Sequence, residues 1–282
     1  MNDPIVIIIN LHNRPNRFLY TLNNLRKVNL NNIIIRKEAC SQERAKKEYY
    51  KYITMEAYNN INNLKNTIII PSWGAVACAI SHIECYKYII DNNIKSAIIC
   101  EDDLSIDNLH KFRLYLNHGM NIIRQNNHTN VFINYNGKEL INHVYYYDDD
   151  LNNNNNNIEG LFPINNFFKN SQFYMINNKM AKTLFSNLIQ IKYQIDVQIS
   201  VLLKQLDQYN KLLYNFSNPG ISHSKKFKSD IQNYFIPKML LYRITKNRDI
   251  FDKIYQFLPN KSNISNNNVY LDYMYQVNQY SY

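Results

Sequence analysis

Three consecutive carboxylates directly after a buried-strand pattern are the feature of this chain most suited to chemistry. Glu101, Asp102 and Asp103 follow the apolar residues 97–100. Adjacent like charges are unfavourable at the end of a buried strand unless a cation meets them. Ligands of open α/β sheets bind at the carboxyl ends of strands, so a divalent cation shared with diphosphate oxygens would suit this position. The alternative is a solvated acidic turn in which Asp107 or a neighbour caps the next helix.

The elements that must position these carboxylates alternate between short apolar runs and helical periodicities. Strand residues point alternately to the two faces of a sheet, which predicts Glu101 and Asp103 on one side and Asp102 on the other. The alternation of elements predicts a doubly wound α/β fold with a mostly parallel central sheet flanked by helices. The expected strands are 4–11, 33–35, 96–100, 131–135, 172–176 and 212–216, and the expected helices include 18–25, 74–90, 109–123, 180–188 and 195–206.

The length of 282 residues, 45% of them hydrophobic, fits one large domain with an appendage. We predict a catalytic domain over residues 1–232 and a helical, Tyr- and Asn-rich extension over 233–282. The polyasparagine run 152–157 predicts a surface insertion loop. No apolar run approaches the roughly 20 residues of a membrane span, and the first residues lack a signal-peptide pattern. These features predict a soluble, cytoplasmic protein.

Cysteine usage and charge narrow the class of partner. Cys40, Cys78, Cys85 and Cys100 form no CxxC pair, which predicts small apolar packing in a reducing compartment rather than disulfides or zinc. The net charge of +10 is compatible with nucleic acid or with a polyanionic small molecule such as a nucleotide diphosphate. Because the basic residues are spread out, we expect the small molecule and no nucleic acid.

Five ordered blocks between residues 5 and 232 resemble family 25 glycosyltransferases, the group of bacterial lipooligosaccharide and procollagen galactosyltransferases. Residues 8–17 resemble its INL-x-x-RP-x-R strand end, and residues 74–82 resemble its G-x-x-G-C-x-x-SH helix, which leads to Glu-Asp-Asp. The other three blocks are 171–176, 195–197 and 219–231. Ala77 and Gln194 depart from the family's glycine and proline, and the polyasparagine run interrupts a region that could contact the acceptor.

The resemblance implies a Rossmann-like fold of the glycosyltransferase A type, a UDP-sugar donor and Mn²⁺ or another divalent cation. It implies inverting transfer of a hexose, with galactose the first choice and glucose or N-acetylglucosamine next. The acceptor would be a hydroxyl on a glycan or on a protein, including hydroxylysine in a collagen-like chain. Asp103 is the first choice of metal ligand, with Glu101 and Asp102 contacting the metal or the ribose. A metal would stabilise the leaving diphosphate without proton transfer.

Four residues at or after the end of the first strand are expected to contact the donor: Asn10, Leu11, Arg14 and Arg17. A guanidinium there could clamp a phosphate or the uracil, whereas the alternative for both arginines is a surface pair with a carboxylate. Asn10 could reach the nucleotide or only cap the turn.

Gly74, Ser81 and His82 are expected at the donor site because they match the second block. Gly74 would allow close backbone approach or simply a turn into the helix. A helical histidine is commonly a satisfied core residue, which is the alternative for His82. The Ser-His pair does not predict hydrolysis, because no nucleophile elbow accompanies it.

Asp196 and His223 complete the predicted site. Asp196 begins a helix whose N-terminus favours the ionised carboxylate, so it is the candidate base for the acceptor hydroxyl, and the alternative is a plain N-cap. His223 could complete the metal shell as a neutral imidazole or be an exposed loop histidine. A non-catalytic binding or scaffold protein with this fold is the competing hypothesis, and a homo-oligomer is left open.

Overall fold

A seven-stranded mixed sheet forms the centre of the computed structural model, in the order β2-β1-β3-β10-β5-β11-β8. The structure describes residues 3–28, 30, 33–63, 69–135, 138–141, 144–145, 161–164, 167–206, 211–216 and 218–227. The strands are β1 (Ile5–Asn10), β2 (Ile34–Glu38), β3 (Ser96–Glu101), β5 (Asn130–Tyr135), β8 (Leu161–Pro163), β10 (Phe173–Asn177) and β11 (Lys211–Phe216). The expected C-terminal extension and polyasparagine loop lie outside the described residues.

The direction of β10 is the main feature that the strand patterns did not predict. β1 runs parallel to β2 and β3, and β5 runs parallel to β11. β10 is antiparallel to both β3 and β5, and β8 is antiparallel to β11. A buried apolar run has the same appearance in either direction. The mostly parallel α/β sheet is nevertheless confirmed, because five of the seven strands share one direction.

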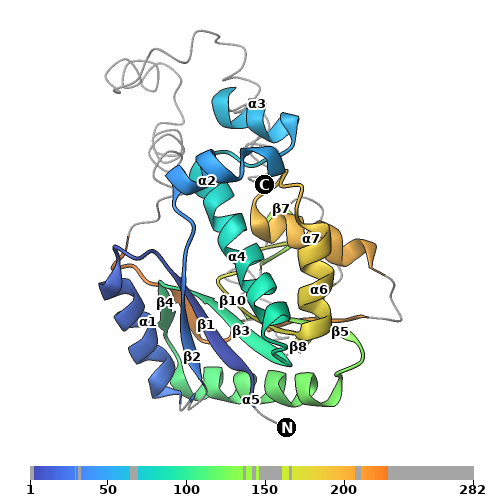
Figure 1. The fold of residues 1–282 in the computed structure, drawn as a ribbon. Coiled ribbons are helices and arrows are strands. Elements are labelled where there is room, and N and C mark those ends of the chain that lie inside the picture. The colour runs from blue at the N-terminus through green and yellow to red at the C-terminus, as the bar shows by residue number, and fades with distance from the viewer. Residues whose placement is uncertain are drawn as a thin grey trace, which may run out of the picture.

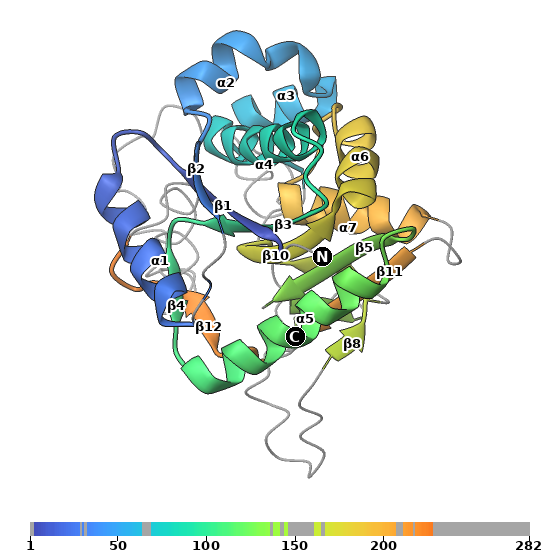
Figure 2. The same ribbon diagram turned by 60° about the horizontal axis from the view of Figure 1, so that its bottom comes forward.

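Helices cover both faces of the sheet (Figures 1 and 2). On one face lie α4 (Trp73–Asp91), α6 (Asn178–Asn187) and α7 (Ile195–Gln205), packed on alternate strand residues such as Ile7 and Ile9. On the other face lie α1 (Pro15–Lys27) and α5 (Leu109–Gln125), packed on Val6 and Ile8. The continuous apolar strand sequence is therefore explained by burial on both faces.

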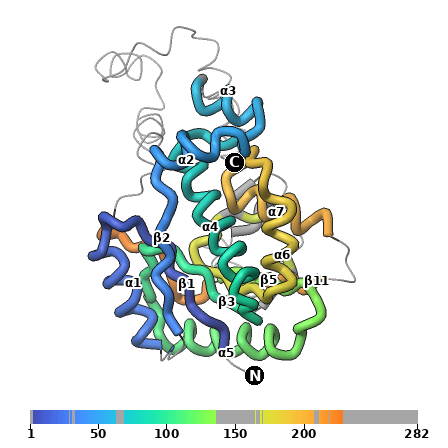
Figure 3. Tube along the Cα trace, viewed as in Figure 1, coloured from blue at the N-terminus to red at the C-terminus, as the bar shows by residue number. Residues whose placement is uncertain are grey.

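Smaller elements surround the carboxyl ends of the parallel strands. The helix α2 (Gln42–Glu48) packs against the amino-terminal half of α4, and η1 (Tyr50–Tyr52) joins it to α3 (Met55–Asn63), which lies near the amino end of α4 (Figure 3). β4 (Leu104–Ile106) pairs with β12 (Ile221–His223). A third sheet contains β6 (Lys138–Ile141), β7 (Val144–Tyr145) and β9 (Phe167–Lys169).

The helix expected over residues 18–25 starts earlier in the structure, where α1 begins at Pro15, because proline at the first helical position loses no hydrogen bond. The helix expected over residues 109–123 starts at Leu109 as predicted. The cap of α5 is Asn108, whose side chain accepts from the Lys111 amide at 3.0 Å. Among the described residues, no helix combines the length and the apolar character that crossing a membrane requires.

Candidate active site

Two buried aspartates meet one arginine where β1 and β3 end side by side. Ile9 pairs with Glu101 across these strands, so the residues that follow each strand are neighbours. Arg17, in the first turns of α1, places Nη2 2.7 Å from Asp102 Oδ1 and 3.5 Å from Asp103 Oδ2. Asp102 and Asp103 are only 8% and 9% exposed. The guanidinium therefore balances two carboxylates that burial would otherwise penalise.

The alternation expected for the three carboxylates is wrong, because β3 ends at Glu101. Asp102 and Asp103 belong to the turn between β3 and β4, so the two-residue period of a strand no longer applies to them. Both contact Arg17, whereas Glu101 Oε1 lies 3.6 Å from His82 Nε2 on α4. The triplet is thus divided between two neighbouring clusters.

Asp102 is positioned by residues at the end of β1. Asn10 Nδ2 donates to Asp102 Oδ2 at 2.6 Å and to the Arg14 carbonyl at 3.0 Å. Arg36 Nε donates to Asn10 Oδ1 at 2.9 Å. Burial raises the pKa of Asp102, and the opposing effects of Arg17 and Asn10 do not fully offset it. Both the nitrogen and the oxygen of the Asn10 amide are therefore hydrogen-bonded, and Asn10 fixes the orientation of Asp102.

Leu11 and Arg14, which were also predicted at this strand end, form backbone hydrogen bonds in the turn before α1. The carbonyl of Leu11 accepts from Arg36 Nη2 at 3.3 Å and from the Arg14 amide at 3.0 Å. The carbonyl of Arg14 accepts from Asn10 and from the Arg17 amide. These bonds shape the turn that presents Arg17 to the aspartates.

Asp103 has the richest set of contacts in the site. Gln172 Nε2 donates to Asp103 Oδ1 at 2.8 Å, and His223 Nδ1 lies 3.2 Å from Oδ2 and 3.3 Å from Oδ1. Burial acts to raise the pKa of Asp103, but hydrogen bonding and charge from His223, with Gln172 and Arg17, lower it below its ordinary value. Asp103 is thus held as an ionised carboxylate beside an imidazole.

His223 reaches this position because β12 pairs with β4 directly after the acidic turn. Their register sets His223 opposite Leu104, and the Ser224 amide donates to the Asp103 carbonyl at 2.7 Å. This pairing brings His223 next to Asp103, although the two residues are 120 positions apart in the sequence. Gly220, at φ +76° just before the ribbon, adopts a conformation that favours glycine.

Asn170 links His223 to Asp196, and sequence reasoning missed it. Its Oδ1 lies 3.1 Å from His223 Nε2, and its backbone amide donates to Asp196 Oδ2 at 2.8 Å. Asn170 has φ +76°, a left-handed conformation in which asparagine is enriched. Asp196 is not the N-cap, which is Gln194; its Oδ1 accepts from the Val197 amide at 2.8 Å.

Gln172 was also not predicted as a site residue, although its sequence context could have identified it. It is a fully buried amide at the head of β10, in an otherwise apolar run, and buried polar residues require partners. Asn170 carried no such signal, because nothing in an asparagine-rich sequence distinguishes it from its neighbours.

Gly74 and Ser81 pack against other residues of the chain. A Cβ at Gly74 would stand 2.9 Å from Gln42 Nε2, so its close approach is to a side chain of α2. Ser81 Oγ accepts from the Cys40 amide at 2.9 Å and donates to the Ala77 carbonyl at 2.7 Å. Ser81 therefore ties the segment after β2 to α4.

Asp103 and His223 fit a divalent cation. Two ligands with bonds of about 2.1 Å to one ion lie roughly 3 Å apart, close to the separation of their oxygen and nitrogen atoms. The carboxylate of Asp103 and the imidazole of His223 suit Mn²⁺ or a similar ion. Glu101 lies in the neighbouring cluster with His82.

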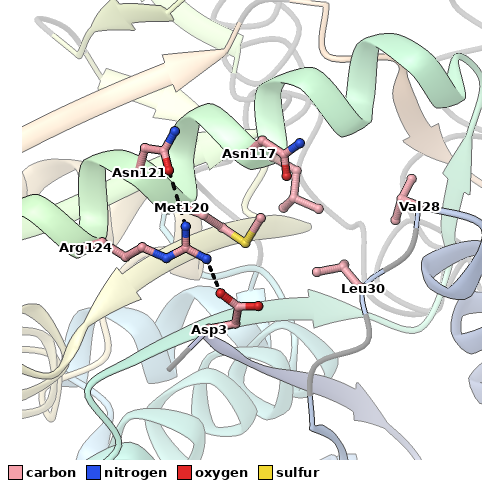
Figure 4. A pocket seen from close by; sticks show the side chains of 8 residues that line it. Asp3, Val28, Leu30, Asn117, Met120, Asn121 and Arg124 are labelled. Carbon is pink, nitrogen blue, oxygen red and sulfur yellow. Dashed lines mark hydrogen bonds and ion pairs between the residues drawn. The ribbon is translucent and has the colours of Figure 1, made fainter. Parts of the chain in front are cut away.

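A separate hollow lies beside the amino end of β1, against α5 (Figure 4). Asp3, which precedes β1, forms an ion pair with Arg124 of α5 there. The other lining residues are Val28, Leu30, Leu116, Asn117, Met120 and Asn121. None of the candidate residues takes part, so this hollow is not the site of the chemistry predicted above.

Comparison with known proteins identifies the enzyme family of the chain. A comparison with curated proteins found no match. The model of glycosyltransferase family 25, described as an LPS biosynthesis protein, matches residues 3–199. The matched segment includes β1, α4, β3 and the start of α7, and with them Arg17, the acidic triplet and Asp196. The chain therefore belongs to glycosyltransferase family 25 and is a glycosyltransferase.

Proposed function

We propose that the protein is an inverting, metal-dependent glycosyltransferase that moves a hexose from a UDP-sugar to a hydroxyl group. Galactose is the first choice of sugar, and the acceptor is a glycan or a protein side chain. The observation that carries the proposal is a continuous set of contacts that joins Asp102, Arg17, Asp103, His223, Asn170 and Asp196. It connects the pair proposed to bind a cation, Asp103 and His223, to the separate carboxylate of Asp196.

Asp103 and His223 would hold the cation, and Gln172 Nε2 would orient the Asp103 carboxylate. When bound, the cation would stabilise the charge that develops on the leaving diphosphate. Arg17 supports the same role, because its guanidinium lies against the aspartates and is suited to phosphate oxygens. Asp102, held by Asn10, would accept a hydrogen bond from the ribose or complete the metal shell.

Asp196 would take the proton of the acceptor hydroxyl. Its carboxylate accepts backbone hydrogen bonds from Asn170 and Val197 and lies in the first turn of α7. These amides and the helix N-terminus fix its orientation and favour the ionised form. A carboxylate oxygen has more than one lone pair, so acceptance of these bonds leaves capacity for a substrate proton.

The experiment is a UDP-release assay across UDP-sugars, with and without Mn²⁺. Asp103→Asn should abolish metal-dependent UDP binding, whereas Asp196→Asn should keep UDP binding and lose most of the release. Asp91→Asn is the matched control, because Asp91 is exposed on α4 and pairs only with Lys87 in the contacts described. Wild-type protein that binds UDP but releases none from any UDP-sugar would favour a scaffold. Protein that binds no UDP in Mn²⁺ would reject the proposal.

A further inference from the structure

Three side chains beside the acidic turn bring different ligand atoms together. Cys78 and His82 are four residues apart on α4 and share one face of the helix. Glu101 reaches the same place from the end of β3. The thiol, imidazole and carboxylate ligand atoms all lie within 4.8 Å of one another. This cluster is separate from Asp103 and His223.

The imidazole of His82 is the observation that points to a ligand. His82 is fully buried, and its Nε2 has no hydrogen-bond partner. Glu101 Oε1, at 3.6 Å, is too far for a hydrogen bond. Buried polar atoms without partners are rare in folded proteins and call for an explanation such as a missing ion.

The other ring nitrogen of His82 has the support that metal-bound histidines usually have. Nδ1 lies 2.7 Å from the Tyr174 hydroxyl, which lies 2.7 Å from the Tyr86 hydroxyl. A ligating histidine normally uses its second nitrogen in a hydrogen bond that fixes the ring and its tautomer. With Nδ1–H donated to Tyr174, Nε2 presents its lone pair to Cys78 and Glu101.

We propose that Cys78, His82 and Glu101 bind a divalent cation of the Zn²⁺ type. One sulfur, one nitrogen and one oxygen ligand with an open fourth position match the coordination of zinc sites that keep a free position. A thiolate ligand selects against Mn²⁺, which prefers oxygen, so the two neighbouring sites differ in ion preference. The cysteine spacing predicted no zinc site, because the third ligand comes from another element.

The electrostatic surroundings favour a cation at this place. Burial raises the pKa of Cys78, and the negative charges of Glu101, Asp196 and Asp103 raise it further. Those charges would attract a cation to the same position. Ion binding would release the thiol proton, as it does at other thiolate sites, and would then satisfy the imidazole and the carboxylate together.

The test uses full-length protein that has been stripped with a chelator and titrated with Co²⁺. We expect a sulfur-to-cobalt charge-transfer band that saturates at a single equivalent and is removed by excess Zn²⁺. The band should be lost in Cys78→Ser and retained in Cys85→Ser, a buried cysteine of the same helix outside the cluster. It should also be retained in Asp103→Asn, which separates this site from the proposed donor site.

Two further variants keep the test decisive if Cys78→Ser folds poorly by circular dichroism. Glu101→Gln should weaken Zn²⁺ binding in calorimetry, and Tyr174→Phe should weaken it by about 10- to 100-fold, the usual effect of removing the partner of a metal-bound histidine. No charge-transfer band in the wild type, or a band unchanged in Cys78→Ser, would overturn the proposal. The readout is independent of UDP release, so its failure is distinguishable from failure of the proposed transferase activity.

Discussion

Removal of the Arg17 guanidinium should destabilise the protein strongly when no metal is present. The side chain is only 14% exposed and contacts two aspartate side chains that are 11% and 12% exposed. Loss of one partner of a buried ion pair costs about 3–5 kcal/mol, because the other charge stays buried without compensation. Asp102 keeps its bond from Asn10, and Asp103 keeps those from Gln172 and His223. We therefore expect a loss of about 3 kcal/mol, at the lower end of this range.

The assay is equilibrium urea unfolding of Arg17→Gln and wild type in a chelator. The double variant Arg17→Gln/Asp102→Asn should recover part of the loss, because the closest unpaired charge is then removed. Lys87→Gln is the control, since Lys87 and Asp91 form an exposed pair worth at most about 0.5 kcal/mol. If Arg17→Gln lost less than about 1 kcal/mol, the two aspartates would not depend on Arg17 and our account of the site would be wrong.

Three other predictions concern separate parts of the molecule. Burial raises the pKa of Cys40 to about 11, so only about 0.1% of this thiol is ionised at pH 8; alkylation followed by mass spectrometry should be slow in the native protein and fast in urea. Gly119→Ala should destabilise the fold by about 1–3 kcal/mol in urea unfolding, because a Cβ would overlap the Tyr135 hydroxyl. Asn170→Ala should lower UDP release more than Asn170→Gly, because alanine also strains the backbone at φ +76°; equal release by the two variants would exclude a backbone contribution.

The elements of the sheet could be predicted because their sequence patterns report burial directly. Residues 5–9 and 97–100 are apolar on both faces, which is the requirement of strands covered by helices on each side. The direction of β10 could not be predicted in this way, because Phe173 and Ile176 would be equally buried in either orientation. The direction of a strand depends on the end of the sheet at which the preceding segment arrives. The polyasparagine run before β10 has no pattern from which that end could be predicted.

The site residues that could be predicted are those whose burial is unfavourable in free energy unless a partner is present. Asp102 and Asp103 are such residues, and Arg17 meets both. The division of the triplet was not predictable, because it depends on the strand giving way to a turn directly after Glu101. Asn170 was not predictable either, since it acts partly through its backbone amide and backbone groups leave no mark in a sequence.

The contacts of Arg17 predict that a divalent cation and a nucleotide diphosphate bind cooperatively. A divalent cation held by Asp103 would bring positive charge to within a few ångströms of the Arg17 guanidinium, and like charges at that distance repel. Arg17 would then be displaced from Asp103 and become available to the anion that accompanies the cation. A nucleotide diphosphate carries the required charge and oxygen geometry. Metal and nucleotide should therefore bind cooperatively, each more tightly in the presence of the other, and Arg17→Gln should weaken that coupling while Asp103 remains intact.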